Sequence, residues 1–118
     1  MCFYKINNKH PIVYYLKILL NIIDLLPLVV QLKSLTKKIV LYGSCANGTD
    51  TVNSDIDLLI ITDSEIKPIV RKIVIQYNKK IDRKISPIIK TKREWLQIKL
   101  SNKAFYNEVR KGIVLWSQ

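Results

Sequence analysis

The chain has 118 residues, of which 48% are hydrophobic and 25% charged, with only three glycines and four prolines. This length and composition predict one globular domain and exclude a disordered or low-complexity chain. The formal net charge of +11 favours polyanionic partners such as nucleotides or nucleic acid, although a lysine-rich solvated surface gives the same charge.

The cysteines and the single histidine argue against a disulfide-stapled fold and against a zinc site. Cys2 and Cys45 are too few for a disulfide framework, and no CxxC or Cys/His cluster indicates zinc. His10 has no second imidazole or thiol near it in the sequence, so we expect a structural role for it.

The N-terminal region shows no targeting pattern. Its first residues, MCFYKINNKH, lack the basic, apolar and small-residue order of a secretory signal. The apolar stretch at residues 11–32 is interrupted by two charges, an asparagine and a proline, whereas a membrane span needs about 20 largely uninterrupted apolar residues. We therefore expect a soluble, cytoplasmic protein with reduced thiols and no membrane partner.

The first predicted element is a helix over residues 12–26. Apolar residues at helical spacing predict one broad buried face made of Ile12, Leu16, Leu19, Leu20, Ile23 and Leu26. Pro27 is expected to end or kink this helix, and a second short helical piece is expected over residues 28–35. The aromatic side chains of Tyr14 and Tyr15 are expected in the core.

Two strands and a turn follow. The run KIVLY at residues 38–42 predicts a first strand, which Gly43-Ser44 stops, and a helical turn over residues 44–47 is expected before Gly48. After a polar loop, DIDLLII at residues 55–61 predicts a second strand. Because its tail is apolar on both faces, this strand is expected inside a sheet that is covered on both sides.

The remaining elements alternate between helix and strand. A helix is expected after Asp63-Ser64-Glu65, and a third strand over KISPII at residues 84–89, where Pro87 restricts it to a sheet edge. Thr91 and Glu94 form the capping box of a helix over residues 92–99. A further helix is expected over 102–110, and an apolar tail over 113–116 is expected as a short strand or a core plug.

This order of elements predicts the fold class. It is α/β (α+β), with a small mixed sheet of about three to four strands flanked by helices. We expect a single domain over residues 1–118, with a helical part at 1–36, the sheet and its motifs at 37–90, and helices at 91–118.

Acidic residues concentrate at the start of the second strand. Five of the nine acids lie within sixteen positions of one another, namely Asp50, Asp55, Asp57, Asp63 and Glu65. Side chains two positions apart in a strand point the same way, roughly 6–7 Å apart. Asp55 and Asp57 would therefore repel each other unless a cation lies between them, and Mg²⁺ suits such a pair. A calcium loop is excluded, because Leu58 stands where that loop requires glycine and Ser64 where it requires glutamate.

The Gly43-Ser44 turn supplies the second half of a predicted site. Backbone N–H groups of a helical turn beginning there, together with the Ser44 hydroxyl, are suited to bind a triphosphate. Gly48 would let the loop pass close to the ligand. A strand, a Gly-Ser turn, a loop and the SDID motif together indicate a nucleotide site, whereas an ordinary polar loop explains each part alone.

These residues resemble a known family. Gly43-Ser44, Gly48 and Ser54-Asp55-Ile56-Asp57-Leu58 are similar to the pattern of the minimal nucleotidyltransferases, small members of the DNA polymerase β-like superfamily. The segments YKINNKHPI (residues 4–12), KISPIIKTKREW (84–95) and NKAFYNEVRKGIVLW (102–116) resemble members in which this domain follows a winged helix-turn-helix. We expect that DNA-binding part to be missing here.

The resemblance implies an activity and roles for residues. Asp55 and Asp57 would be catalytic and hold Mg²⁺ or Mn²⁺. Gly43 and Ser44 would bind the nucleotide's phosphates, and Gly48 and Ser54 would be further nucleotide-binding residues. The family reaction transfers a nucleoside monophosphate, often AMP, from ATP or another NTP to an acceptor hydroxyl, with loss of pyrophosphate. Bridging metal ions would neutralise charge developing on the leaving group.

The sequence departs from the family at the third strand. Relatives usually carry a third carboxylate there, which completes the metal site, and alignment places Ser86 at that position. A serine hydroxyl is a poor Mg²⁺ ligand or base. Asp82 is a weak substitute, because it would lie about 13 Å along the strand from Ser86 and is better explained as a turn residue.

Three functions remain open from the sequence. The first is an active nucleotidyltransferase. The second is a weakly active or inactive nucleotide-binding regulatory module, such as the antitoxin-like half of a toxin–antitoxin pair, with a protein partner or a second copy of itself. The third is a basic nucleic-acid-binding domain, which only the net charge favours.

Overall fold

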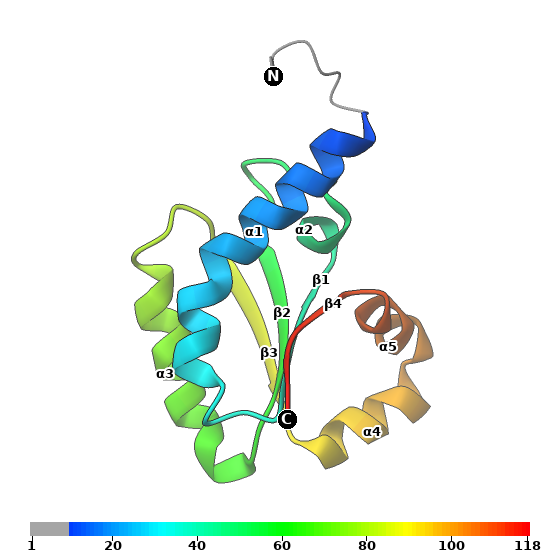
Figure 1. The fold of residues 1–118 in the computed structure, drawn as a ribbon. Helices are drawn as coiled ribbons and strands as arrows, with labels where there is room; N and C mark the ends of the chain where they lie inside the picture. Colours follow the sequence, from blue (N-terminus) through cyan, green and yellow to red (C-terminus); the bar gives the residue numbers. More distant parts are fainter. Residues whose placement is uncertain (1–9) are drawn as a thin grey trace.

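The computed structural model describes residues 10–118 and shows a four-stranded sheet with helices on both faces (Figure 1). The first nine residues, which include Cys2 and most of the YKINNKHPI segment, lie outside the described residues. The elements in chain order are α1 (Pro11–Leu32), β1 (Lys38–Tyr42), α2 (Ser44–Asn47), β2 (Ile56–Ile61), the 3₁₀ turn η2 (Ser64–Ile66), α3 (Lys67–Asn78), β3 (Ile85–Lys90), α4 (Lys92–Ser101), α5 (Lys103–Arg110) and β4 (Ile113–Ser117).

The sheet is mixed, in the order β3-β2-β1-β4. Strand β1 pairs antiparallel with both β2 and β4, whereas β2 and β3 are parallel. The apolar tail at residues 113–116 is therefore a strand, and β3, which contains Pro87, is an edge strand as predicted. The α/β fold class predicted from the sequence is confirmed.

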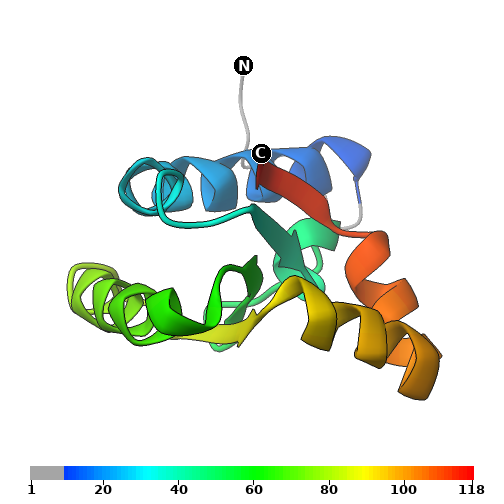
Figure 2. The same cartoon turned by 90° about the horizontal axis from the view of Figure 1, so that it is seen from below.

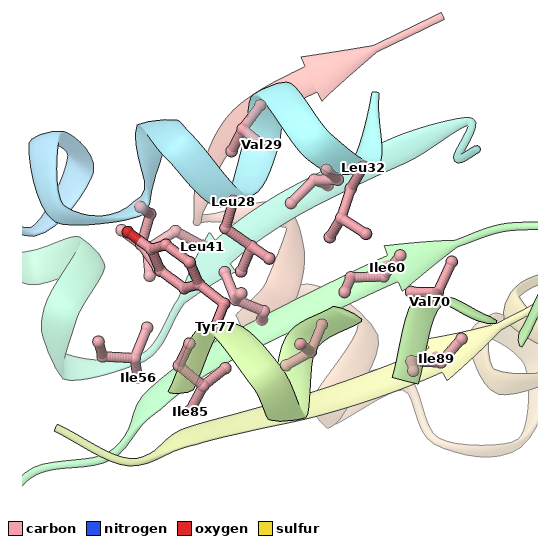
Figure 3. Packing of buried hydrophobic residues seen from close by; sticks show 14 of the residues in the cluster. Leu28, Val29, Leu32, Leu41, Ile56, Ile60, Val70, Tyr77, Ile85 and Ile89 are labelled. Carbon is pink, nitrogen blue, oxygen red and sulfur yellow. The ribbon is translucent and has the colours of Figure 1, made fainter. Parts of the chain in front are cut away.

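Two separate cores cover the two faces of the sheet. Alternate residues of β1 and β2, such as Leu41, Leu58 and Ile60, pack with α1 and α3 (Figure 3). The intervening residues, such as Val40 and Leu59, pack with α4 and α5 on the other face. Five of the six residues of β2 are buried, which confirms the prediction that this strand is covered on both sides.

Helix α1 differs from the prediction in two ways. It continues through Pro27 without ending there, because Leu25, Leu28 and Leu32 on both sides of the proline are buried in the core. Its buried face is also not the predicted one. The side chains that anchor it are Asn21, Leu25, Leu28, Val29 and Leu32, whereas Ile12, Leu19, Leu20, Ile23 and Leu26 are exposed. The prediction that Tyr15 lies in the core is wrong as well, since its side chain is exposed.

Helices α1 and α4 each begin with a side-chain cap, whereas the turn after Asp63 does not. His10 precedes α1, and its Nδ1 accepts a hydrogen bond of 3.2 Å from the backbone of Ile12, which confirms a structural role. The capping box of α4 is present, with Thr91 and Glu94 bonded reciprocally. Asp63 makes no capping hydrogen bond and instead pairs with Lys37 at 3.0 Å.

Helix α1 is also long and apolar enough to cross a membrane, judged by length and composition alone, and it is the one such helix within residues 10–118. A core helix of a soluble protein passes the same test. Here the inner side of α1 packs against the sheet, as Figure 3 shows for Leu28, Val29 and Leu32.

Candidate functional site

The Gly-Ser turn lies where β1 ends. Gly43 has φ +76° and ψ −156°, and this left-handed backbone conformation turns the chain directly into α2. The first turn closes with a hydrogen bond of 3.1 Å from the Ala46 N–H to the Gly43 carbonyl. Because the first N–H groups of a helix have no acceptor within it, the turn presents donors at the end of β1.

The two aspartates lie at the same end of the sheet. Asp55 directly precedes β2, and Asp57 is paired with Tyr42, the last residue of β1. Asp57 packs on the turn itself, since a β-carbon added to Gly43 would lie 2.6 Å from the Asp57 carboxylate Oδ2. The predicted phosphate-binding turn and the predicted metal-binding aspartate are therefore in direct contact.

Strand β3 adds a hydroxyl to this pair. Ser86 is the parallel-register partner of Asp57, and its Oγ donates a hydrogen bond of 2.9 Å to Oδ2 of Asp55. The structure thus brings Ser86, which alignment placed at the third metal position, next to both aspartates. Among residues 10–118 no group of three or more His, Cys, Asp or Glu side chains is arranged to hold a metal ion.

The site is electronegative. Burial raises the pKa of Asp57, and the charges of Asp55 and then Glu108 raise it further. Burial, followed by the charges of Asp57 and Glu108, raises the pKa of Tyr42 to about 12. A bound cation would relieve this repulsion. Sequence reasoning missed Glu108, because only the packing of α5 against β1 brings its charge close to β2.

A partly buried arginine holds the loop between the two motifs. Arg83 donates to the carboxylate of Asp50 at 2.8 Å, to the side-chain oxygen of Asn21 at 3.0 Å and to the sulfur of Cys45 at 2.9 Å. It also donates twice to the backbone carbonyl of Ser54, at 3.3 and 3.0 Å. One guanidinium group therefore ties α2, the loop and the residue before Asp55 to one another. The sequence shows no local signal for this network, because its members are up to 62 positions apart.

Replacing Arg83 by methionine is expected to lower the free energy of unfolding by about 3 kcal/mol, since the carboxylate of Asp50 would be left buried and unpaired. Urea unfolding monitored by circular dichroism measures this loss. The double variant Arg83→Met/Asp50→Leu should recover part of it, because no unpaired charge remains. A loss below about 1 kcal/mol for the single variant would show that the network contributes little.

The fold itself requires a glycine at position 48, whether or not a ligand is bound. Its φ is +73°, and a β-carbon there would lie 2.4 Å from the backbone oxygen of Tyr14 in α1. The glycine therefore permits the close contact of α2 with α1, and its predicted contact with a nucleotide stays a prediction.

Replacing Gly48 by alanine is expected to cost about 2–4 kcal/mol of stability, from the left-handed backbone and the collision with α1. Thermal unfolding measures the effect. The matched control is Asn47→Ala at the neighbouring exposed position, which should change stability by less than about 0.5 kcal/mol. Equal stabilities for the two variants would contradict the contact.

The two remaining predicted residues, Ser54 and Asp82, lie in different settings. The Ser54 Oγ accepts a hydrogen bond of 3.0 Å from the Thr51 N–H and so closes the loop, and its nucleotide contact stays a prediction. Asp82 lies in the turn before β3, as expected, and lines an open cavity of about 610 Å³ with Asp24 and Ile56. That cavity is lined by neither Asp55 nor Asp57, so it is separate from the candidate site.

Residues 22–111 match the model of a protein family described as a nucleotidyltransferase domain. A solved structure, described as a candidate nucleotidyltransferase from Sulfolobus solfataricus, aligns with 90% of this chain and 88% of its own, with a TM-score of 0.54. The two chains are 16% identical, so this likeness shows the fold alone. No curated protein matches the chain significantly.

Proposed function

This chain belongs to the nucleotidyltransferase domain family, and from that membership we propose that it transfers a nucleoside monophosphate, AMP in the first instance, from a nucleoside triphosphate to an acceptor hydroxyl. Pyrophosphate is the second product. The observation that carries the proposal is the contact of the Gly43 turn with Asp57, which joins a phosphate-binding turn to a carboxylate pair. The catalytic residues of this proposal are Asp55 and Asp57.

The donor set fits a divalent cation. Two carboxylates and the Ser86 hydroxyl offer only oxygen atoms, which hard cations such as Mg²⁺ and Mn²⁺ prefer. Asp55 and Asp57 would be enough protein carboxylates, because Mg²⁺ sites in proteins usually supply only one or two and leave the other ligands to water and phosphate oxygens. A cation bound there supplies neutralisation of the charge that develops on the departing pyrophosphate.

The chain's own groups position the triphosphate. The N–H groups at the start of α2 and the Ser44 hydroxyl donate to phosphate oxygens, and Gly43 keeps side-chain atoms out of the way. The Arg83 network holds the loop so that Ser44 and Asp55 keep their relative positions. Catalysis by this site would rest mainly on orientation and electrostatics.

A second candidate function has a specific observation in its favour. Ser86 occupies the third position, where it donates to Asp55 and offers no carboxylate to accept the acceptor's proton. Loss of a positioned general base costs about 10²–10⁴ in rate. The second candidate is therefore a nucleotide-binding regulatory module, of the antitoxin-like kind, that binds without turnover.

One experiment separates the two functions. The protein is incubated with nucleotides labelled at the α-phosphorus and with nucleoside, RNA and protein acceptors, while calorimetry measures binding of Mg-ATP. Label transfer above an Asp55→Asn/Asp57→Asn blank supports the transferase. Binding without transfer supports the regulatory module, and no binding at millimolar nucleotide would exclude both.

A further inference from the structure

Helix α1 carries a second apolar face on the side away from the core. Seven of its large apolar side chains are between 40% and 72% exposed, and together we name them the outer α1 face: Ile12, Tyr15, Leu19, Leu20, Ile23, Leu26 and Val30. Helix α1 lies at the periphery of the molecule, with the sheet and the other helices on its inner side (Figure 1 and Figure 2). Most of these residues belong to the stripe whose spacing predicts burial, and the described part of the chain does not bury them.

The outer α1 face is uncharged in a strongly basic protein. The charged residues of α1 are Lys17 and Asp24, and at about 100° per residue both lie roughly a third of a turn from the centre of the stripe. The Lys17 ammonium donates a hydrogen bond of 3.1 Å to the backbone oxygen of Asp50. By contrast, α3 exposes Arg71 and Lys72. An apolar surface of this size on a soluble domain indicates an interaction site.

Four of the seven residues form pairs that are symmetric along the helix. Ile12 and Val30 are equally distant from Asn21, and so are Leu19 and Ile23. Two copies of α1 laid antiparallel about Asn21 would therefore place Leu19 of one against Ile23 of the other. A closed twofold dimer requires a self-complementary surface of this kind.

We infer that the outer α1 face is a homodimer interface, in which the α1 helices of two copies pack antiparallel across a twofold axis. The seven side chains offer on the order of 700 Å² per copy, close to the ~800 Å² per partner of a standard stable interface. The inference is independent of the proposed function, because it concerns the face of α1 that points away from the sheet.

A lipid surface fits the same face less well. Helices that lie in a membrane interface flank their apolar face with lysine and arginine. Between residues 12 and 30, Lys17 is the one basic residue. Its ammonium is hydrogen-bonded to the backbone of Asp50. Spanning a membrane would also require α1 to leave the core, where Leu25, Leu28 and Leu32 are fully buried.

The solution mass of the full chain tests the inference. Sedimentation equilibrium at about 100 µM should give twice the 13.8 kDa of one copy for the wild type. The variant Leu19→Glu/Ile23→Glu should be monomeric, with its dimer dissociation constant raised at least about 100-fold, since two charges would be buried against apolar partners. Leu100→Glu, at an exposed apolar position of α4, is the matched control and should stay dimeric.

Cross-linking tests the antiparallel arrangement. Oxidation of the Leu19→Cys/Ile23→Cys variant in a Cys2→Ser background should give a covalent dimer, whereas each single cysteine variant should not. Efficient cross-linking of the single variants would overturn the antiparallel packing. A monomeric wild type would overturn the dimer. If that monomer also sediments with phosphatidylglycerol vesicles, and does so only when Leu19 and Ile23 are intact, the outer α1 face binds a membrane instead.

Discussion

Replacing Asp57 by asparagine is expected to lower nucleotide transfer at least about 10³-fold, because charge stabilisation by a bound metal ion is worth several kcal/mol. The same change should not unfold the protein. Burial and the charge of Asp55 raise the pKa of Asp57, so its ionised form is disfavoured in the folded state when no cation is bound. A neutral amide removes this repulsion. The melting temperature without metal should therefore stay the same or rise, while the stabilisation that Mg²⁺ gives the wild type is lost.

Label transfer and thermal unfolding with and without Mg²⁺ measure the two effects on the same preparations. The matched control is Asp63→Asn, which removes a carboxylate that is exposed and paired with Lys37 away from the turn. Its transfer rate should equal that of the wild type. Transfer that survives in Asp57→Asn, or a loss of transfer that accompanies a fall in melting temperature, would contradict the assigned role.

Replacing Ser86 by aspartate is expected to raise the transfer rate by about 10²-fold or more, since it supplies a carboxylate next to both aspartates in register. Without metal, three neighbouring carboxylates repel, so the variant should melt below the wild type. With Mg²⁺ it should gain more stability than the wild type does. A lower melting temperature without metal, together with a larger stabilisation by Mg²⁺, is the signature of a third metal ligand.

Ser86→Ala is the control for this gain. It removes the hydrogen bond to Asp55 without adding a charge, and it should change the transfer rate less than tenfold. Rates and metal responses of Ser86→Asp that match those of the wild type would show that the third position lies outside the metal site. In that case the regulatory module would become the favoured function.

The parts of the fold that the sequence predicts are those with local signals. Lys38–Tyr42 and Ser44–Asn47 begin and end where the β-branched run and the glycines predict. The capping box at Thr91 and the edge position of Pro87 follow from the chemistry of single residues and their neighbours. The contact of the Gly43 turn with Asp57 has a similar origin, because both motifs lie within residues 43–57, whereas the place of Ser86 beside them was implied by the family resemblance alone.

The parts that the sequence does not predict depend on tertiary contacts. A helical apolar stripe does not say which of two apolar faces meets the sheet, and in α1 the face with Leu25 and Leu28 does so. Packing on both sides of Pro27 likewise outweighs the local tendency of proline to end a helix. Arg83 and Glu108 lie far from the motifs in sequence and approach them only in the folded chain.

The most direct test of the nucleotide site is a crystal structure of the protein with Mn²⁺ and a non-hydrolysable ATP analogue, with the metal located by its anomalous scattering. We expect Mn²⁺ between the carboxylates of Asp55 and Asp57. The triphosphate should lie on the turn formed by Gly43 and Ser44, with water or Ser86 at the third position. Binding of the triphosphate elsewhere, or an anomalous peak away from both aspartates, would contradict the account.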